Sequence, residues 1–222
     1  MSLFPIVAPM EDSGVAEVSL TANAIDATSA TVYTFSTQAL GVAAADRIIV
    51  VGAFSTNVAR TISTITVGGV SATLTVAQSN GGGEQSELWQ AAVPTGTTGD
   101  IVVTWSGGVV GMGIGVWRIV SAASAAHDTG GDANSNPATD TLDIPASGVA
   151  IGFVGAASTG GTVTWTGLTE RYDALGVEAA GSGTHSGSSD AFDAIQTGLA
   201  ISATLSNKIR NPPMAIASWG PA

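Results

Sequence analysis

The chain has 222 residues, of which 10% are charged, and its 6 Lys and Arg against 17 Asp and Glu give a formal charge of −11. A surface with so few cations cannot neutralise a row of phosphates, which argues against nucleic acid and anionic membranes as partners. Apolar residues make up 45% of the chain and cysteine is absent, so we expect a packed core with no disulfide and no thiolate metal site.

Residues 1–14 are predicted to form an extended N-terminal arm. Pro5 and Pro9 restrict the residues before them to extended conformations, and the segment has neither the basic start of a signal peptide nor a membrane span. We therefore expect no signal peptide. An apolar arm needs a surface to lie against. Its own domain is the simpler choice, and a neighbouring subunit is the functional one.

Beyond the arm, apolar residues alternate with Thr, Ser or Gly at a period of two, and no sustained stretch has helical spacing. The alternation predicts strands over residues 15–21, 30–36, 47–54, 86–93, 100–106, 112–120, 148–156, 162–166, 169–175, 191–197, 199–205 and 214–219. Many short strands separated by turn signals are typical of antiparallel sandwiches. We predict an all-β fold, an antiparallel β-sandwich of jelly-roll type, in a single domain over residues 15–222.

The clearest single element is a hairpin over residues 62–76, with Gly68-Gly69 as a two-residue turn. Counting outward from this turn predicts the pairs Val67 with Val70, Ile65 with Ala72, and Ser63 with Leu74. The opposite face then carries Thr64, Thr66, Ser71, Thr73 and Thr75. One face is therefore predicted to be core and the other a threonine-covered exterior.

Three segments are predicted to connect strands. Residues 37–45 are rich in alanine and could hold one helical turn, whereas residues 126–139 and 178–189 are predicted to be polar loops, the second one flexible. A division of the chain near residues 126–140 is an alternative, because residues 100–107 and 161–167 have similar sequences. One matching pair of short strands is weak support for a duplication, so a single domain is preferred.

Groups that could carry catalysis are scarce. The chain has two histidines, His127 and His185, and one lysine, Lys208. His185 lies in residues 183–187, which imitate a nucleophile elbow with His in place of Ser, and no pair of carboxylates has a spacing that marks an acid and a base. We predict that the protein is not an enzyme.

Residues 132–143 have the oxygen-ligand spacing of a calcium loop. The candidate ligands are Asp132, Asn134, Asn136, Asp140 and Asp143. However, Pro137 stands where such a loop needs Gly, and Asp143 replaces the usual bidentate Glu. Asx turns account for the same residues without an ion and are the preferred interpretation. Calcium is the alternative, and no other cofactor is predicted.

The tryptophans offer a second functional hypothesis, because sugar-binding sandwiches stack pyranose rings on exposed aromatic side chains. Alternation places Trp105 and Trp165 in the interior. Trp89, Trp117 and Trp219 are the candidates for a ligand-binding platform, and Trp117 follows a strip of glycines on its strand. A core face filled by one large ring from the opposite sheet is the simpler explanation of the same pattern.

A resemblance to a known family rests on four segments: Thr31-Val-Tyr-Thr-Phe35, Asp46-Arg-Ile-Ile-Val-Val51, Asp100-Ile-Val-Val-Thr-Trp-Ser106 and Val116-Trp117-Arg118. In texture and strand rhythm the chain resembles the β-sandwich virion structural proteins of tailed bacteriophages and phage-like particles. The resemblance implies a decoration, spike, fibre-base or tail component, made in the bacterial host cytoplasm and released with the virion.

We therefore expect a non-enzymatic virion structural protein, most simply a capsid decoration or spike component. Its expected partners are further copies of itself, as a homo-oligomer, and other virion proteins such as capsid or tail proteins. Nucleic acid and membrane are not expected as partners. The alternative function is a carbohydrate-binding β-sandwich module that attaches the particle to a host glycan.

Overall fold

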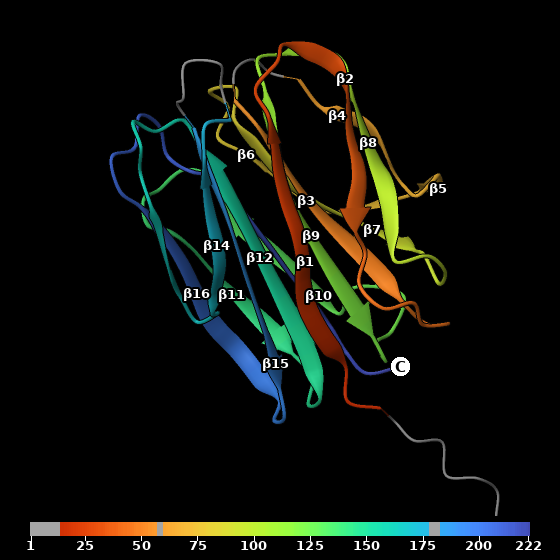
Figure 1. The fold of residues 1–222 in the computed structure, drawn as a ribbon. Coiled ribbons are helices and arrows are strands. Elements are labelled where there is room, and N and C mark those ends of the chain that lie inside the picture. Colours follow the sequence, from red (N-terminus) through yellow and green to blue (C-terminus); the bar gives the residue numbers. More distant parts are fainter. Residues whose placement is uncertain (1–13, 57–59, 178–182) are drawn as a thin grey trace, which may run out of the picture.

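The computed structural model describes residues 14–56, 60–177 and 183–222 (Figure 1). Every strand pairing among these residues is antiparallel, and none of these residues is helical. The predicted all-β class is thus confirmed. The predicted arm, residues 1–14, lies outside the described residues apart from Gly14.

The strands form two outer and two inner sheets. The first outer sheet has the order β2 (Ala30–Ala39), β8 (Thr98–Val109), β4 (Ile62–Val67), β5 (Val70–Ser71). The first inner sheet has the order β1 (Glu17–Asp26), β9 (Met112–Val120), β3 (Ile48–Ser55), β7 (Gln85–Ala92), β6 (Thr73–Ser79). The second inner sheet has the order β10 (Asp128–Asp132), β17 (Met214–Trp219), β12 (Gly148–Ala156), β15 (Thr184–Phe192), β14 (Glu170–Leu175). The second outer sheet has the order β11 (Ala138–Ile144), β16 (Gln196–Leu205), β13 (Val163–Thr166).

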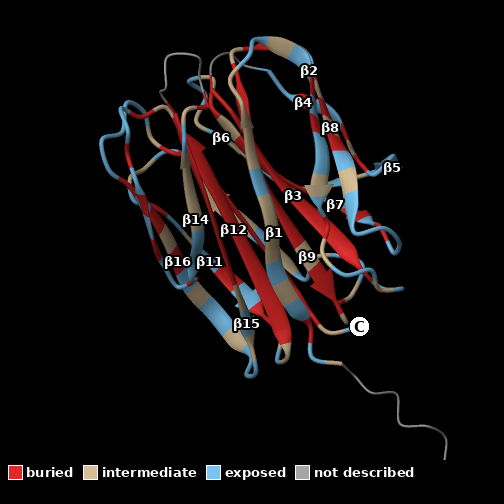
Figure 2. Cartoon of the chain, in the orientation of Figure 1, coloured by how far each residue is buried: buried red, intermediate tan, exposed pale blue. Residues whose placement is uncertain are grey.

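Three hydrophobic clusters fix the order of these sheets as four stacked layers. The first cluster joins the first outer and first inner sheets, for example through Tyr33 and Val51. The second joins the two inner sheets, and the third joins the second inner and second outer sheets. The central strands β3 and β12 are buried along their whole length because both of their faces are covered (Figure 2). Their nearly continuous apolar sequences follow from this double burial.

The two halves of the chain repeat one strand order. The first inner sheet has the order β1-β9-β3-β7-β6, and the second inner sheet has the equivalent order β10-β17-β12-β15-β14. In the same way, β2-β8-β4 of the first outer sheet corresponds to β11-β16-β13 of the second. The similar segments 100–107 and 161–167 lie on β8 and β13, which are not equivalent strands in this repeat. The halves meet at residues 121–127, beside the alternative division near 126–140. The two halves also share the central hydrophobic cluster. The single domain over residues 15–222 stays a prediction.

The two inner sheets interlock through an exchange of phenylalanine and glycine. The Phe54 ring of β3 fills the space over Gly155 of β12, and the Phe153 ring of β12 fills the space over Gly52 of β3. In each contact the two positions are 101 residues apart and equivalent in the repeat. Equivalent positions touch each other when an approximate two-fold axis runs between them. These two contacts set the register of β3 against β12 in the central cluster.

Several predicted strand boundaries are wrong. The segment 126–139 was predicted to be a loop but contains β10, and the predicted loop 178–189 contains most of β15, whose residues 184–189 are fully buried. The predicted strand over residues 191–197 does not exist, because β15 ends at Phe192 and β16 begins at Gln196. Instead of a helical turn within residues 37–45, β2 continues to Ala39.

The predicted hairpin is confirmed only near its turn. Val67 pairs with Val70, and the Ala72 N–H donates to the Ile65 carbonyl at 2.9 Å. Beyond Ala72 the chain crosses to the first inner sheet, where Leu74 pairs with Trp89 and not with Ser63. Leu74, predicted to be core, is consequently half exposed at the sheet edge.

Candidate functional site

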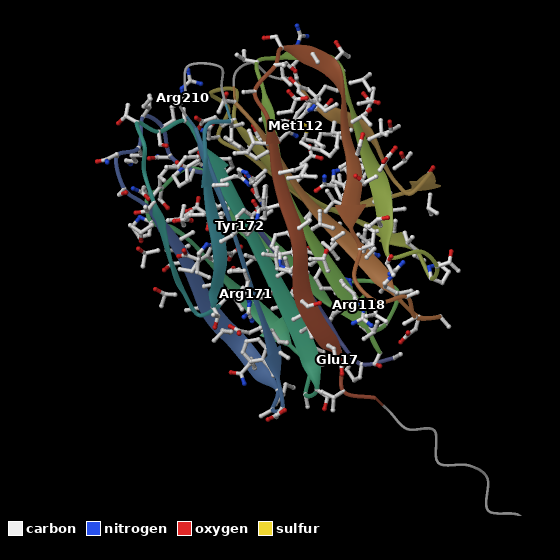
Figure 3. The ribbon with its side chains drawn as sticks, viewed as in Figure 1. Glu17, Met112, Arg118, Arg171, Tyr172 and Arg210 are labelled. Carbon is white, nitrogen blue, oxygen red and sulfur yellow. The ribbon has the colours of Figure 1, made fainter. Side chains whose placement is uncertain are left out.

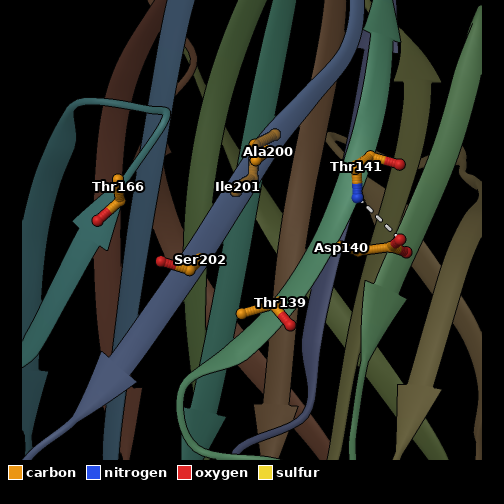
Figure 4. Close-up of a pocket in the computed structure, with 7 residues that line it drawn as sticks. All are labelled: Thr139, Asp140, Thr141, Thr166, Ala200, Ile201 and Ser202. Atoms are coloured by element: carbon orange, nitrogen blue, oxygen red, sulfur yellow. Dashed lines mark hydrogen bonds between the residues drawn. The ribbon is translucent and has the colours of Figure 1, made fainter.

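The candidate site is a groove of about 260 Å³ on the exposed face of the second outer sheet (Figure 4). Its lining comes from β11, from the end of β13 and from β16: Thr139, Asp140, Thr141, Thr166, Ala200, Ile201 and Ser202. Thr139 pairs with Ser202, and Ser202 pairs with Thr166, so three hydroxyl side chains form a row across the sheet. Thr141 pairs with Ala200, whose small side chain leaves the hollow.

The alternation of the strands explains which groups the groove presents. Leu142 and Ala203 point into the third cluster, so their neighbours in sequence point outward. Ile201 is buried in the third cluster, so its side chain points into the core beneath the sheet. The Asp140 carboxylate accepts from the Gly131 N–H at 2.6 Å and from the Thr141 N–H at 2.8 Å. The groove therefore offers mainly neutral hydroxyl and methyl groups.

The exposed face of the first outer sheet has the same character. Val32, Thr104 and Thr64 form one row across β2, β8 and β4, and Thr34, Val102 and Thr66 form the next. None of these six residues is ionisable, and Val32 is 52% exposed. Asp100 and Asp143 stand at the ends of the two outer faces and accept from the Thr37 and Gly198 N–H groups.

Arg60 lies against Gly107 at the end of β8 in the first outer sheet, whereas the other arginines lie away from the two outer faces. Arg118 on β9 is 4.0 Å from Glu17 on β1, and Arg171 on β14 is 3.3 Å from Asp190 (Figure 3). Arg210 lies in the loop between β16 and β17 and donates to the Gly82 carbonyl. Arg47 is buried, and its guanidinium donates to five backbone carbonyls. Ion pairs and carbonyl contacts thus hold these arginines at the inner layers and loops.

The proposed tryptophan platform is wrong, because all three candidates are buried. Trp117 and Trp219 are fully buried between the inner sheets, and Trp89 is only 8% exposed beside the first outer sheet. The glycine strip before Trp117 is filled by rings of the opposite sheet: His185 stands over Gly113 and Tyr172 over Gly115. This is the simpler of the two sequence interpretations. The interior positions of Trp105 and Trp165 are confirmed.

Four of the five candidate calcium ligands use their side chains in separate backbone contacts. Asp132 accepts from the Asn134 N–H at 2.8 Å, as in an Asx turn. Asn136 exchanges two hydrogen bonds with the Leu205 backbone, both at 2.9 Å. Asp140 and Asp143 accept from Gly131 and Gly198. Within the described ranges no group of three His, Asp or Glu could hold a metal ion. A calcium site at residues 132–143 stays a prediction.

His185 lies in the interior and not in an exposed elbow. It stands on β15, where its Nδ1 is 3.1 Å from the Tyr172 hydroxyl and its Nε2 has no partner. Burial lowers the pKa of His185 to about 3, so the imidazole is neutral at physiological pH. A buried neutral histidine beside a tyrosine offers no route for substrate.

Sequence analysis missed a second buried titratable group, Glu87. Its side chain is 2% exposed and accepts from Trp89 Nε1 at 2.5 Å. Burial raises the pKa of Glu87 to about 7, against the smaller lowering effect of that hydrogen bond. The only signal in the sequence is a carboxylate inside an otherwise apolar and small-residue strand.

Comparison of the chain with models of protein families, with curated proteins and with solved structures gives no match. Among the described residues no helix is long and apolar enough to span a membrane.

Proposed function

We propose that the chain is a tandem pair of jelly rolls and serves as a non-enzymatic structural protein of a virus particle, as a capsid decoration or spike component. The strand order supports the first part. Taking β5 and β6 as one strand that changes sheets, the first half has β1-β9-β3-β7 in one sheet and β2-β8-β4-β5 in the other. This strand order supports a jelly roll in the first half, and the second half repeats it with three strands in its outer sheet. Jelly rolls are common in viral capsid proteins.

The observation that carries the assembly function is the absence of ionisable side chains from the central rows of both outer faces. A chain with a net charge of −11 has acidic side chains elsewhere, yet these two faces carry Thr, Ser, Val and Ala. Charged residues are depleted from the centres of protein interfaces because their desolvation is costly. The faces are therefore suited to contact other proteins.

The virus particle as the place of assembly follows from the sequence resemblance to phage β-sandwich proteins. On this proposal the chain is made in the bacterial host cytoplasm, joins a homo-oligomer and contacts capsid or tail proteins. The buried positions of His185 and Glu87 fit a role without catalysis.

Sedimentation velocity of the purified full chain tests the assembly function. We expect oligomers whose share grows with protein concentration and persists in moderate salt, because uncharged faces are little affected by screening. A chain that stays monomeric up to high concentration, and that does not bind isolated capsid or tail proteins, would contradict the proposal.

Carbohydrate binding is the second candidate, and the groove in Figure 4 favours it. The hydroxyl row of Thr139, Ser202 and Thr166 can exchange hydrogen bonds with sugar hydroxyls, although no aromatic side chain lines the groove. A glycan array tests this function. Binding that is lost in Ser202→Val and kept in Ser124→Val, an exposed serine outside the groove, would support it.

A further inference from the structure

The two outer faces of the molecule have complementary shapes. On the first outer sheet Val32 is 52% exposed, and it is followed two residues later by the exposed Thr34. The second outer sheet instead has the groove of about 260 Å³, where Ala200 leaves a hollow above Ile201. An exposed valine on one face can fill a hollow that the small Ala200 leaves on the opposite face.

We infer that the first outer sheet of one copy docks on the second outer sheet of the next copy, with Val32 over the groove at Ala200. The inference rests on the proposed function and names its partner as a second copy of this chain. The contact is heterologous, because two different surfaces meet. A heterologous contact leaves one free face of each kind on every dimer, so it continues into a ring or an open row.

Charge selects these faces for contact between copies. Two chains that each carry −11 repel each other wherever their acidic side chains meet. The central rows of both faces hold no ionisable group. The nearest carboxylate, Asp140, lines the groove and accepts from the Gly131 and Thr141 N–H groups, and Asp100 and Asp143 stand at the ends and also accept backbone hydrogen bonds. Docking through these faces therefore brings copies together where repulsion is smallest and little charge is desolvated.

The geometry of stacked sheets permits close docking. Outward side chains recur about every 6.8 Å along a strand and about every 4.8 Å across a sheet, so rows on two facing sheets can interdigitate. The molecule already contains such a contact, since its two inner sheets pack face to face through one cluster. The docked outer sheets would extend the same stack with Thr, Ser, Val and Ala in place of rings.

Blocking each face separately tests the inference. Val32→Lys places a charge on the first face, and Ala200→Lys places one in the groove. Ala125→Lys is the matched control, because Ala125 is exposed in the connection between the halves and the change of charge is the same. Circular dichroism and thermal melting check that each variant remains folded.

We expect wild type and Ala125→Lys to form the same series of oligomers in sedimentation velocity, and each single-face variant to sediment as a monomer. The decisive sample is an equimolar mixture of Val32→Lys and Ala200→Lys. The first variant keeps a free groove and the second keeps a free Val32, so the mixture should form dimers and no larger species.

Three results would overturn the inference. If Val32→Lys or Ala200→Lys alone still forms dimers, the contact is between like faces. If both variants assemble like wild type, the contact lies elsewhere and only the assembly function survives. If wild type itself is monomeric, the docking is absent, and binding to isolated capsid or tail proteins then decides the proposed function separately.

Discussion

At the scale of single residues, His185 makes the stability of the fold depend on pH. The imidazole lies between the inner sheets, with Tyr172 as its hydrogen-bond partner and the backbone of Gly113 beneath it. No carboxylate is within hydrogen-bond distance of its ring in the described structure. A proton added to this ring in the folded state would therefore have no compensating charge.

The first prediction concerns the acid side of the stability curve of His185→Gln. The folded pKa of about 3 lies below the unfolded value of 6.5, so His185 stabilises the fold fully above pH 6.5 and progressively less as pH falls towards 3. Its contribution should fall by about 1.4 kcal/mol per pH unit in this window. Urea unfolding at several pH values should show that the variant lacks this loss of unfolding free energy as pH falls. Equal slopes for wild type and variant would contradict it.

Glu87 has the opposite dependence, which gives the second prediction. Its folded pKa of about 7 lies above the usual 4.5, so its contribution is full below pH 4.5 and is lost as pH rises to about 7. Glu87→Gln keeps an acceptor for Trp89 Nε1 and removes the buried charge. We expect the variant to be more stable than wild type at pH 8, by up to about 3 kcal/mol. A variant that is less stable at pH 8 would show that the carboxylate is needed there.

Gly155 gives the third prediction. A Cβ at this position would collide with the Phe54 ring, so Gly155→Ala should lower the free energy of unfolding by about 1 to 3 kcal/mol. Gly108→Ala is the control, because a Cβ there meets nothing closer than 3.9 Å. Urea unfolding measures both. Adding Phe54→Leu to Gly155→Ala should cost less than the sum of the two single changes.

At the scale of elements, the period-two pattern indicated strands where one face is buried and the other is exposed to solvent. The strands that carry Trp105 and Trp165 follow this pattern and were predicted with the right faces. The strand that carries Thr139, β11, has the same pattern but was not predicted, because residues 132–143 were interpreted as Asx turns. Both outer sheets belong to this class. The groove itself was not predicted, because it depends on the register that sets Thr141 beside Ala200.

The missed strand β15 lacks this signal for a physical reason. Residues 184–189 of β15 are Thr, His, Ser and Gly, a composition typical of a loop, yet all are buried. They are small because they face bulky rings: Gly187 lies against Trp117 and Tyr172. When the large side chains of a contact come from the facing strands, the strand with the small residues cannot be recognised from its own sequence. Likewise, burial of Trp117 and Trp219 requires the opposite inner sheet, which sequence alone does not place.

At the scale of the whole molecule, two buried groups with opposite pKa shifts, His185 and Glu87, offset each other. Between pH 4.5 and 6.5, His185 stabilises the fold more as pH rises and Glu87 stabilises it less, each by about 1.4 kcal/mol per unit. The fourth prediction is that these two contributions cancel in wild type. The stability of Glu87→Gln should rise with pH across this range and that of His185→Gln should fall. The double variant should have the same pH slope as wild type.

The shared central cluster leads to the fifth prediction, a single unfolding transition for the whole chain. The first half contributes Val50 and Trp117 to the cluster, and the second half contributes Phe153 and Trp219. The loops add polar links, with Asn80 donating to the Asn211 carbonyl at 2.9 Å. Calorimetry should therefore give one peak with equal calorimetric and van't Hoff enthalpies. Two separate peaks would show that the halves unfold independently.

The interlocked glycines and phenylalanines have a consequence for synthesis on the ribosome. The first half, with Phe54 and the hollow at Gly52, emerges roughly 100 residues before Phe153 and Gly155 complete its inner face. At about 5 to 20 residues per second this interval lasts on the order of ten seconds. During that time a finished first sandwich would leave a sheet of valines, isoleucines and a tryptophan uncovered. Nascent chains on neighbouring ribosomes could then exchange halves, so the density of ribosomes on the message would affect the yield of correctly paired protein.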